Sequence, residues 1–429
     1  MNDAVVVGGG VIGAFIAYEL ASRGAKVSLL ESGTLGSAAS YGNAGLIVPS
    51  YSVPMANPAS IRMGLKALIH KEDAIKIGLR LDPAYWAWLA RFIAACHHNR
   101  VSTSAAILCD LSNASMDLYD RLFDAHPGES VGFERKGWLY VYRTTKAFQQ
   151  GIAQARFVEQ FGIPWQHLSG SDVLTLEPAL APKLAGGVFY PGDGILNPYR
   201  LVQFVASLAQ ESGASIETGV TVQALKIRNR RVQAAITNAA GVEAATFVVA
   251  AGVSSPALLG DLSPRLPVQP AKGYSLTFPR VPDSPRIPLN LAESHVVVSP
   301  LAQQVRLTGG LDLVGLDGSM STRRLDGIWR AARSYLPGLD QPEAPERWYG
   351  FRPMTPDGMP VIGPLETVEN LIIATGHGTL GITLGPITGR LVAELVTAES
   401  IPTRMKPLLP SRFRFRRAID QPRWTHADW

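Results

Sequence analysis

Three glycines near the start of the chain have the spacing of a loop that binds dinucleotide phosphates. Gly8, Gly10 and Gly13 form G-x-G-x-x-G directly after the apolar residues 4–7. Gly8 permits a tight turn, Gly10 leaves room for a pyrophosphate, and Gly13 lets a helix pack closely on a strand. Glu31 ends a second apolar segment, where a carboxylate can accept hydrogen bonds from both ribose hydroxyls. The pattern predicts dinucleotide binding, and the acidic residue disfavours the 2′-phosphate of NADP.

An arginine is the first candidate for binding a carboxylate. Arg352 lies in residues 350–353, a Gly- and Pro-rich segment that cannot form a regular helix. A guanidinium offers two parallel hydrogen bonds to a carboxylate and keeps its charge near neutral pH. The alternative is a structural ion pair with an acid such as Asp357.

A second glycine-rich turn, residues 376–381, connects an apolar strand to a helix. The start of that helix presents free backbone N–H groups and a partial positive charge. His377 could contact a bound group, or it could be a turn histidine bonded to the backbone, and both readings remain open. The candidates for cofactor contact in this turn are Gly376, Gly378, Thr379, Leu380 and Gly381.

Two further segments carry weaker candidates. Backbone amides could approach a cofactor at the small residues Ser40, Gly42, Asn43, Ala44 and Gly45, although an ordinary Gly/Ser loop has the same composition. Tyr274 could reach a substrate carboxylate or amine, although a half-buried strand tyrosine more often packs in a core. The remaining cofactor candidates are Val11, Ile12, Ser32, Ser40, Gly42, Asn43, Ala44, Gly45, Val222, Ala251 and Gly252.

Elements far apart in the chain are needed to position these residues. Residues 4–31 predict a strand–helix–strand unit, and a helix at 200–210 leads into strands at 213–217 and 220–222 that would rejoin its sheet. Apolar strands at 246–252 and 371–378 follow the same plan, and a helix is predicted from about 381 to 399. A nucleotide domain built from three separate pieces favours FAD over NAD, because the flavin end needs a distant third contact.

Composition bounds the remaining options. The chain has 429 residues, 46% hydrophobic and 17% charged, and only two cysteines, Cys96 and Cys109. This excludes a disulfide scaffold, a cysteine-built zinc site and an iron–sulfur cluster, and no metal-ligand spacing is present. We expect no signal peptide and no membrane-spanning segment. The formal net charge of +5 equals that of residues 404–429, so the neutral remainder does not indicate nucleic-acid binding.

Five motifs resemble the glycine oxidase/D-amino acid oxidase family of FAD-dependent enzymes, most closely bacterial D-amino acid dehydrogenases. The carriers are GGGVIG (8–13), SYGNAGLIVP (40–49), KGYSLT (272–277), GFRPMTPDGMPVIG (350–363) and TGHGTLGITL (375–384). The last two are specific, and the resemblance covers nearly the whole chain. It implies that Arg352 clamps the substrate carboxylate. It also implies that the start of the helix after residue 380 faces N1 and the C2 carbonyl of a non-covalent FAD.

The resemblance also implies an architecture. We expect an α/β fold (α+β overall), with a Rossmann-like FAD domain of discontinuous segments and a mixed-sheet substrate cap. The FAD domain is predicted at 1–60, 190–262 and 345–429, and the cap at 61–189 and 263–344. Within the cap we predict strands at 137–142, 269–278 and 305–308, helices at 85–97 and 105–125, and a core containing Trp86, Trp88 and Trp138.

The expected reaction is oxidation of a free D-amino acid, or of a cyclic imino acid such as D-hydroxyproline. Electrons would leave to a quinone or a partner redox subunit. The alternatives are an oxygen-using oxidase of the same fold, a non-catalytic FAD subunit of an electron-transfer complex and, least favoured, an NAD-linked dehydrogenase. We expect a bacterial cytoplasmic location, with peripheral association at the cytoplasmic face of the inner membrane as a second option. The basic tail, residues 404–429, could bind an acidic membrane or partner, or could pack on its own domain.

Overall fold

A six-stranded sheet forms the nucleotide-binding half of the molecule. The computed structural model describes residues 2–69, 75–78, 80–127, 131–340, 342–397 and 400–413. The strand order is β19-β20-β13-β1-β2-β9, parallel except for the β19–β20 pair. The strands are β1 (Asn2–Val7), β2 (Val27–Glu31), β9 (Ser215–Thr218), β13 (Ala244–Val249), β19 (Val361–Pro364) and β20 (Leu371–Thr375). As predicted, segments far apart in the chain meet in one sheet.

Both faces of this sheet are covered, which explains its continuous apolar strands. Ala4 and Val6 pack in the cluster that contains residues of α1 (Val11–Ala21), α7 (Pro198–Glu211) and α10 (Gly381–Thr397). Val5 and Val7 face the opposite side and pack against a three-stranded meander. The meander consists of β10 (Val222–Arg228), β11 (Arg231–Thr237) and β12 (Gly241–Val242), with α8 (Ser255–Leu258) nearby.

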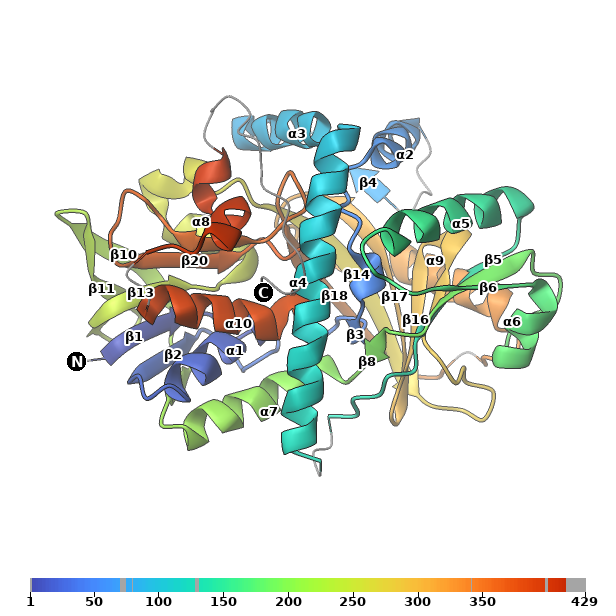
Figure 1. The fold of residues 1–429 in the computed structure, drawn as a ribbon, viewed down its shortest axis with the longest axis horizontal. Coiled ribbons are helices and arrows are strands. Elements are labelled where there is room, and N and C mark those ends of the chain that lie inside the picture. The colour runs from blue at the N-terminus through green and yellow to red at the C-terminus, as the bar shows by residue number, and fades with distance from the viewer. Residues whose placement is uncertain are drawn as a thin grey trace.

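The second half is a mixed, largely antiparallel sheet that extends away from the first (Figure 1). Its order is β18-β14-β17-β16-β15-β5-β7-β6, and β4 pairs with β17. The strands are β4 (Ile75–Ile77), β5 (Trp138–Tyr142), β6 (Gln166–Leu168), β7 (Gly186–Tyr190), β14 (Gln269–Pro279), β15 (Leu289–Leu291), β16 (Val296–Leu301), β17 (Gln304–Leu313) and β18 (Glu346–Met354). Helices α5 (Thr145–Glu159), α6 (Gly170–Leu176) and α9 (Thr322–Tyr335) pack on it, and Leu325 and Ile328 of α9 enter its core.

The described residues form three further α-helices: α2 (Pro58–Ile69), α3 (Pro83–Ala95) and the long α4 (His98–Ala125), which crosses the front between the two halves (Figure 1). The Tyr119 hydroxyl of α4 donates to the Ile382 carbonyl oxygen of α10 at 2.6 Å. A two-stranded ribbon, β3 (Leu46–Ile47) with β8 (Gly194–Ile195), leads into the 3-10 helix η1 (Pro49–Tyr51). None of the helices in the described ranges is long and apolar enough to cross a bilayer.

The structure corrects three details of the prediction. Val222 begins the meander instead of rejoining the first sheet, in which β9 is the edge strand beside β2. The strand β18, placed in the nucleotide half by a boundary at residue 345, pairs with β14 in the cap sheet. Trp86 is 46% exposed, because on α3 it points away from the side occupied by the buried Trp88. Trp138 is buried as predicted.

The predicted tail divides into two parts. Residues 404–413 pack on the nucleotide half as the 3-10 helices η5 (Thr403–Leu408) and η6 (Pro410–Phe413), with Met405 and Leu408 buried. Arg412 donates to both carboxylate oxygens of Asp357, at 2.7 and 3.2 Å, and Arg404 pairs with Glu394. The described part is therefore a strap on its own domain. Residues 414–429 lie outside the described residues.

Candidate active site

A cavity of about 810 Å³ connects the two halves. Sites for cofactors and small ligands are typically about 300–1,000 Å³. Most sequence-predicted residues line this cavity: Gly8, Gly10, Val11, Ile12, Glu31, Ser32, Ser40, Gly42, Asn43, Ala44, Val222, Ala251, Gly252, Tyr274, Arg352, His377, Gly378, Thr379 and Gly381. Residues from stretches far apart in the chain therefore meet at one place.

The first glycine loop has the geometry that its spacing predicts. Gly8 has φ +111°, in a region that side chains rarely adopt. A Cβ at Gly13 would overlap the carbonyl oxygen of Gly8, so only glycine lets α1 lie this close to β1. The first turn of α1 lines the cavity through Val11 and Ile12, and the first N–H groups of a helix have no intrahelical partners. This is the arrangement that binds a pyrophosphate.

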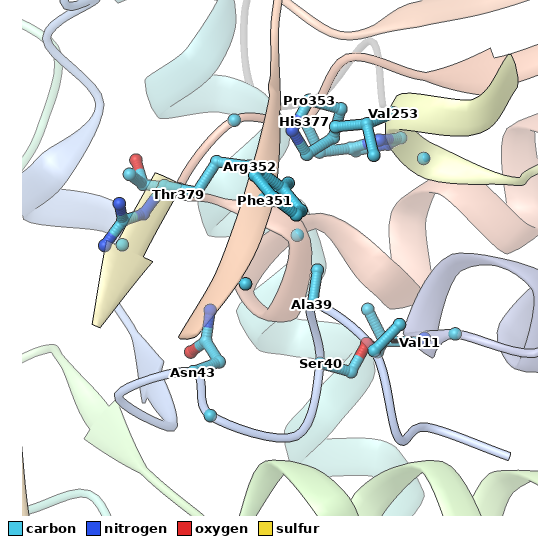
Figure 2. A pocket seen from close by; sticks show the side chains of 18 of the residues that line it. Val11, Ala39, Ser40, Asn43, Val253, Phe351, Arg352, Pro353, His377 and Thr379 are labelled. Atoms are coloured by element: carbon cyan, nitrogen blue, oxygen red, sulfur yellow. Dashed lines mark hydrogen bonds between the residues drawn. The ribbon is translucent and has the colours of Figure 1, made fainter. Parts of the chain in front are cut away.

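The acidic residue and the small-residue loop lie on either side of α1's start. Glu31 Oε2 accepts from Gly9 N at 2.6 Å and Oε1 from Gly33 N at 2.8 Å, which fixes the carboxylate at the cavity edge. Ser40 Oγ accepts from Val11 N at 3.1 Å. Figure 2 shows Ser40 beside Val11, below the strand that carries Phe351, Arg352 and Pro353. Backbone groups of residues 40–44 thus face the same cavity as the helix start.

Four predicted cofactor residues do not line the cavity. Gly13 serves the packing described above, and Leu380 is buried in the main core cluster. Gly45 (φ +75°) and Gly376 (φ +78°) supply left-handed turns, and a Cβ at Gly45 would overlap the Leu196 carbonyl oxygen. These residues shape the backbone around the site. Gly13 has the packing role that its position in the motif predicts.

Arg352 lies on β18 with its guanidinium on the cavity side. Its Nη1 donates to the Gly310 carbonyl oxygen at 3.0 Å, and the guanidinium lies directly against Gly273 of β14. Burial lowers the pKa of Arg352 from its ordinary value, and Tyr51 and Asp312 oppose this shift. The ion pair with Asp357 that we considered is not formed, because Asp357 pairs with Arg412. A cationic fork inside an apolar cavity is suited to a carboxylate.

Tyr274 borders the cavity, but its hydroxyl is bonded on the core side of the sheet. It pairs with Tyr349 in the β14–β18 ladder, whereas Arg352 stands three positions further along β18 and so on the opposite face. The Tyr274 ring belongs to the core under α9, and its hydroxyl donates to Asp312 Oδ2 at 3.1 Å. Burial and the Asp312 charge raise the pKa of this phenol. Tyr274 thus borders the cavity but its hydroxyl is committed elsewhere.

His377 is a buried neutral imidazole at the wall of the cavity. Its Nε2 lies 3.0 Å from Thr388 Oγ1, and the Thr388 hydroxyl donates to the Leu384 carbonyl oxygen at 2.7 Å. Thr388 therefore accepts from Nε2–H, which leaves Nδ1 unprotonated. Burial lowers the pKa of His377 to about 3, so it carries no charge near neutral pH. The hydrogen-bond partner of His377 is thus Thr388, a side chain of α10. Neither of the two interpretations of His377 from the sequence predicted this contact.

Sequence reasoning missed three residues at this site. Tyr51 of η1 lines the cavity, and its hydroxyl forms no hydrogen bond with any other part of the described chain. Trp348 of β18 covers Gly42, where a Cβ would overlap the indole ring. Arg306 of β17 is 3% exposed and bonds the loop at residues 40–45. For these three residues the sequence held one indirect signal, the small size of Gly42, which is the residue that Trp348 covers.

The lining residues fit a flavin dinucleotide better than a nicotinamide one. The glycine loop and Glu31 suit the phosphates and a ribose, and residues 220–223 line the same end of the cavity. A second helix start, that of α10, meets the cavity through Gly378, Thr379 and Gly381. Its partial positive charge would face a negative ring. The free cysteines, Cys96 and Cys109, are not among the lining residues.

Comparison with known proteins decides the family. Residues 3–395 match the family described as FAD dependent oxidoreductase. The chain belongs to this family. It is an FAD-dependent oxidoreductase, and the α/β architecture of its two sheets is the fold of that family.

Relatives within this oxidoreductase family extend over nearly the whole chain. A D-amino acid dehydrogenase of Methylobacterium nodulans is 33% identical over 404 residues, covering 92% of this chain and 95% of the relative. One of Vibrio vulnificus is 32% identical, covering 92% and 96%. Among solved structures, glycine oxidase from Bacillus cereus superposes with a TM-score of 0.77 at 23% identity, covering 98% of this chain and 100% of that one. L-proline dehydrogenase from P. horikoshii gives 0.71 at 19% identity, covering 96% and 97%. These two structures share the fold.

Proposed function

We propose that this oxidoreductase removes a hydride from Cα of a free D-amino acid, or of a cyclic imino acid such as D-hydroxyproline. The product imine then hydrolyses to a 2-oxo acid, with release of ammonia where the amine is primary. The observation that carries the proposal is the Arg352 guanidinium, held at the wall of a largely apolar cavity that the cofactor loops also line. The two dehydrogenase relatives support the substrate class.

Arg352 would bind the substrate carboxylate. A guanidinium has five N–H donors, so the bond from Nη1 to Gly310 O still leaves a fork for two carboxylate oxygens. Gly273 and Gly350 border the cavity beside it. The absence of a side chain at Gly273 leaves room for the guanidinium itself, and the absence at Gly350 leaves room for the Trp348 indole. A bound carboxylate would then fix the position of Cα, which hydride transfer requires more than it requires a basic side chain.

Tyr51 would supply a further donor to the same carboxylate. Burial raises the pKa of Tyr51 while the charge of Arg352 opposes the rise, which indicates that the two side chains are close enough to interact. The Tyr51 ring also packs edge-on against Trp138, with centroids 5.6 Å apart. This tyrosine takes the role that the sequence suggested for Tyr274.

Bound non-covalently, FAD would supply the electron acceptor at its N5 atom. The glycine loop, Glu31 and residues 40–44 would hold its dinucleotide and ribityl parts, and the start of α10 would face its ring. His377 would line the ring's surroundings as a neutral group. We propose a quinone or a partner redox subunit as the next acceptor, and a bacterial cytoplasmic location with peripheral membrane association as the variant.

The test is anaerobic mixing of the yellow enzyme with D- and L-amino acids, glycine and the hydroxyproline isomers, while the flavin band is followed. We expect bleaching with a D-amino or cyclic imino acid. Reoxidation by a quinone analogue but not by air would separate a dehydrogenase from an oxidase. Failure of every carboxylate-bearing amine to bleach the band would leave the non-catalytic subunit as the better account.

The carboxylate contact is tested by Arg352→Lys. Arg347→Lys, on the exposed side of the same strand, is its control. Lysine keeps the charge but loses the fork, so KM should rise by about 10- to 100-fold while FAD content stays normal. The control should behave like the parent enzyme. Equal KM values for all three would remove Arg352 from the proposed site.

A further inference from the structure

One buried arginine joins the cap sheet to the cofactor loop. Arg306 stands on β17, and its Nη1 donates to the carbonyl oxygens of Tyr41 and Asn43, at 2.7 and 2.8 Å. Its Nε donates to Thr277 Oγ1 of β14 at 3.0 Å, which orients the guanidinium from the cap side. The arginine and its two carbonyl partners are more than 260 residues apart in the chain.

The charge of Arg306 is buried, and burying it would cost free energy if the loop of residues 40–45 did not supply hydrogen-bond acceptors. Only 3% of the residue is exposed, and none of its three hydrogen bonds in the described structure goes to a carboxylate. Burial lowers the pKa of Arg306, and Glu346 opposes this shift. A buried guanidinium needs its N–H groups satisfied. The two loop carbonyls provide this for Nη1, so the loop conformation and the arginine stabilise each other.

The same loop is held from a second direction. The Trp348 indole of β18 lies over Gly42, between the two carbonyls that Arg306 binds, and also lies against Gly350. Asn43 Oδ1 accepts from Gly45 N at 2.9 Å and closes the turn. The backbone of residues 40–44 is thus set by contacts from the cap sheet, although the loop follows directly from the nucleotide half.

The strand β17 also reaches the proposed carboxylate site. Gly310, four positions after Arg306, accepts the hydrogen bond from Arg352. One strand therefore bonds the loop that faces the cofactor through Arg306, and supports the substrate arginine through Gly310. The position of β17 therefore sets the distance between the cap sheet and the loop of residues 40–45.

We propose that Arg306 is a positioning residue that locks the loop of residues 40–45 to the cap sheet, and so determines both FAD affinity and the spacing between FAD and substrate. The FAD part rests on the family and the cavity, whereas the substrate part rests on the proposed function. Arg306 itself touches neither ligand in this assignment.

The experiment uses the full chain, freed of FAD and titrated with FAD while flavin fluorescence is followed. Arg306→Met keeps the apolar stem but removes the donors, and Arg306→Lys keeps a charge with fewer donors. Thr277→Val removes only the group that orients Nε. We expect FAD to bind at least tenfold more weakly to Arg306→Met, with Arg306→Lys and Thr277→Val in between. Arg404→Met, an arginine outside the cavity lining, is the control and should match the parent.

Two further readouts separate positioning from general stability. The melting temperature of the FAD-free variants should stay close to that of the FAD-free parent, and the visible circular dichroism of bound flavin should change in Arg306→Met. FAD affinity equal to the parent, or a loss fully accounted for by a lower melting temperature, would overturn the proposal. Because FAD titration needs no substrate, a failed substrate screen would refute the proposed function and leave this result standing.

Discussion

Replacing Gly273 by alanine would disturb Arg352 without changing it. A Cβ built on Gly273 lies 2.5 Å from both Cζ and Nη2 of Arg352, closer than real Cβ contacts occur. Gly273 does not have a positive φ, so the backbone tolerates alanine. The nearest atoms belong to the end of a flexible side chain. We therefore expect the fold to persist and the guanidinium to move.

The size of the movement gives the expected effect. Ordinary contact begins at 3.4 Å, so the guanidinium must shift by about 1 Å. A misplacement of about 1 Å can cost about 100-fold in rate, and loss of one hydrogen bond to a charged group costs about 1.5–3 kcal/mol. We expect kcat/KM to fall by about 10- to 100-fold, mostly through KM, because the carboxylate contact weakens before chemistry begins.

Steady-state kinetics with an artificial electron acceptor, together with FAD content and thermal unfolding, would measure this. Gly327→Ala on α9 is the control, since its Cβ meets no other atom within 4 Å. Alanine there should stabilise the helix by about 0.5–1 kcal/mol and leave KM unchanged. A folded, FAD-loaded Gly273→Ala enzyme with the parent's KM would refute the placement of the carboxylate on Arg352.

Three other predictions follow from the site and its supports. Tyr51→Phe should raise KM about tenfold with kcat near the parent value, and an unchanged KM would remove Tyr51 from the carboxylate site. Burial raises the pKa of Asp193 to about 7, above its unfolded value near 3.8, although Ser50 donates to it from both N and Oγ. Stability from this group is present below about pH 4 and lost as pH rises through 7, so chemical unfolding of Asp193→Asn should show a flatter pH slope between pH 4 and 7. Truncation after Pro407 removes Arg412 and its bonds to Asp357, so the melting temperature and FAD content should fall, whereas truncation after Phe413 should preserve both.

Much of the nucleotide half was predictable because its constraints are local. Gly13 reflects a close backbone approach to Gly8 within a single strand–turn–helix unit, and a sequence pattern records such sterics directly. The apolar strands at residues 4–7 and 371–375 indicate burial on both faces of a parallel sheet. The place of Arg352 at the cavity was predictable because a charged fork in a Gly- and Pro-rich segment has few structural uses, whereas its carboxylate contact stays a prediction.

The tertiary structure decided which side chains share the cavity. Whether the Tyr274 hydroxyl reaches the Arg352 side of the sheet depends on strand register. The β14–β18 pairing places Tyr274 on the face opposite Arg352, which leaves Tyr51 as the candidate hydroxyl beside that arginine. The reason for glycine at 42 is the Trp348 ring, and the partner of the residue 40–45 loop is Arg306, both from distant strands. A one-residue shift in register would reverse each of these faces. Contacts of this kind arise from how sheets pack against loops, so the sequence determines the local units and the packing determines the site.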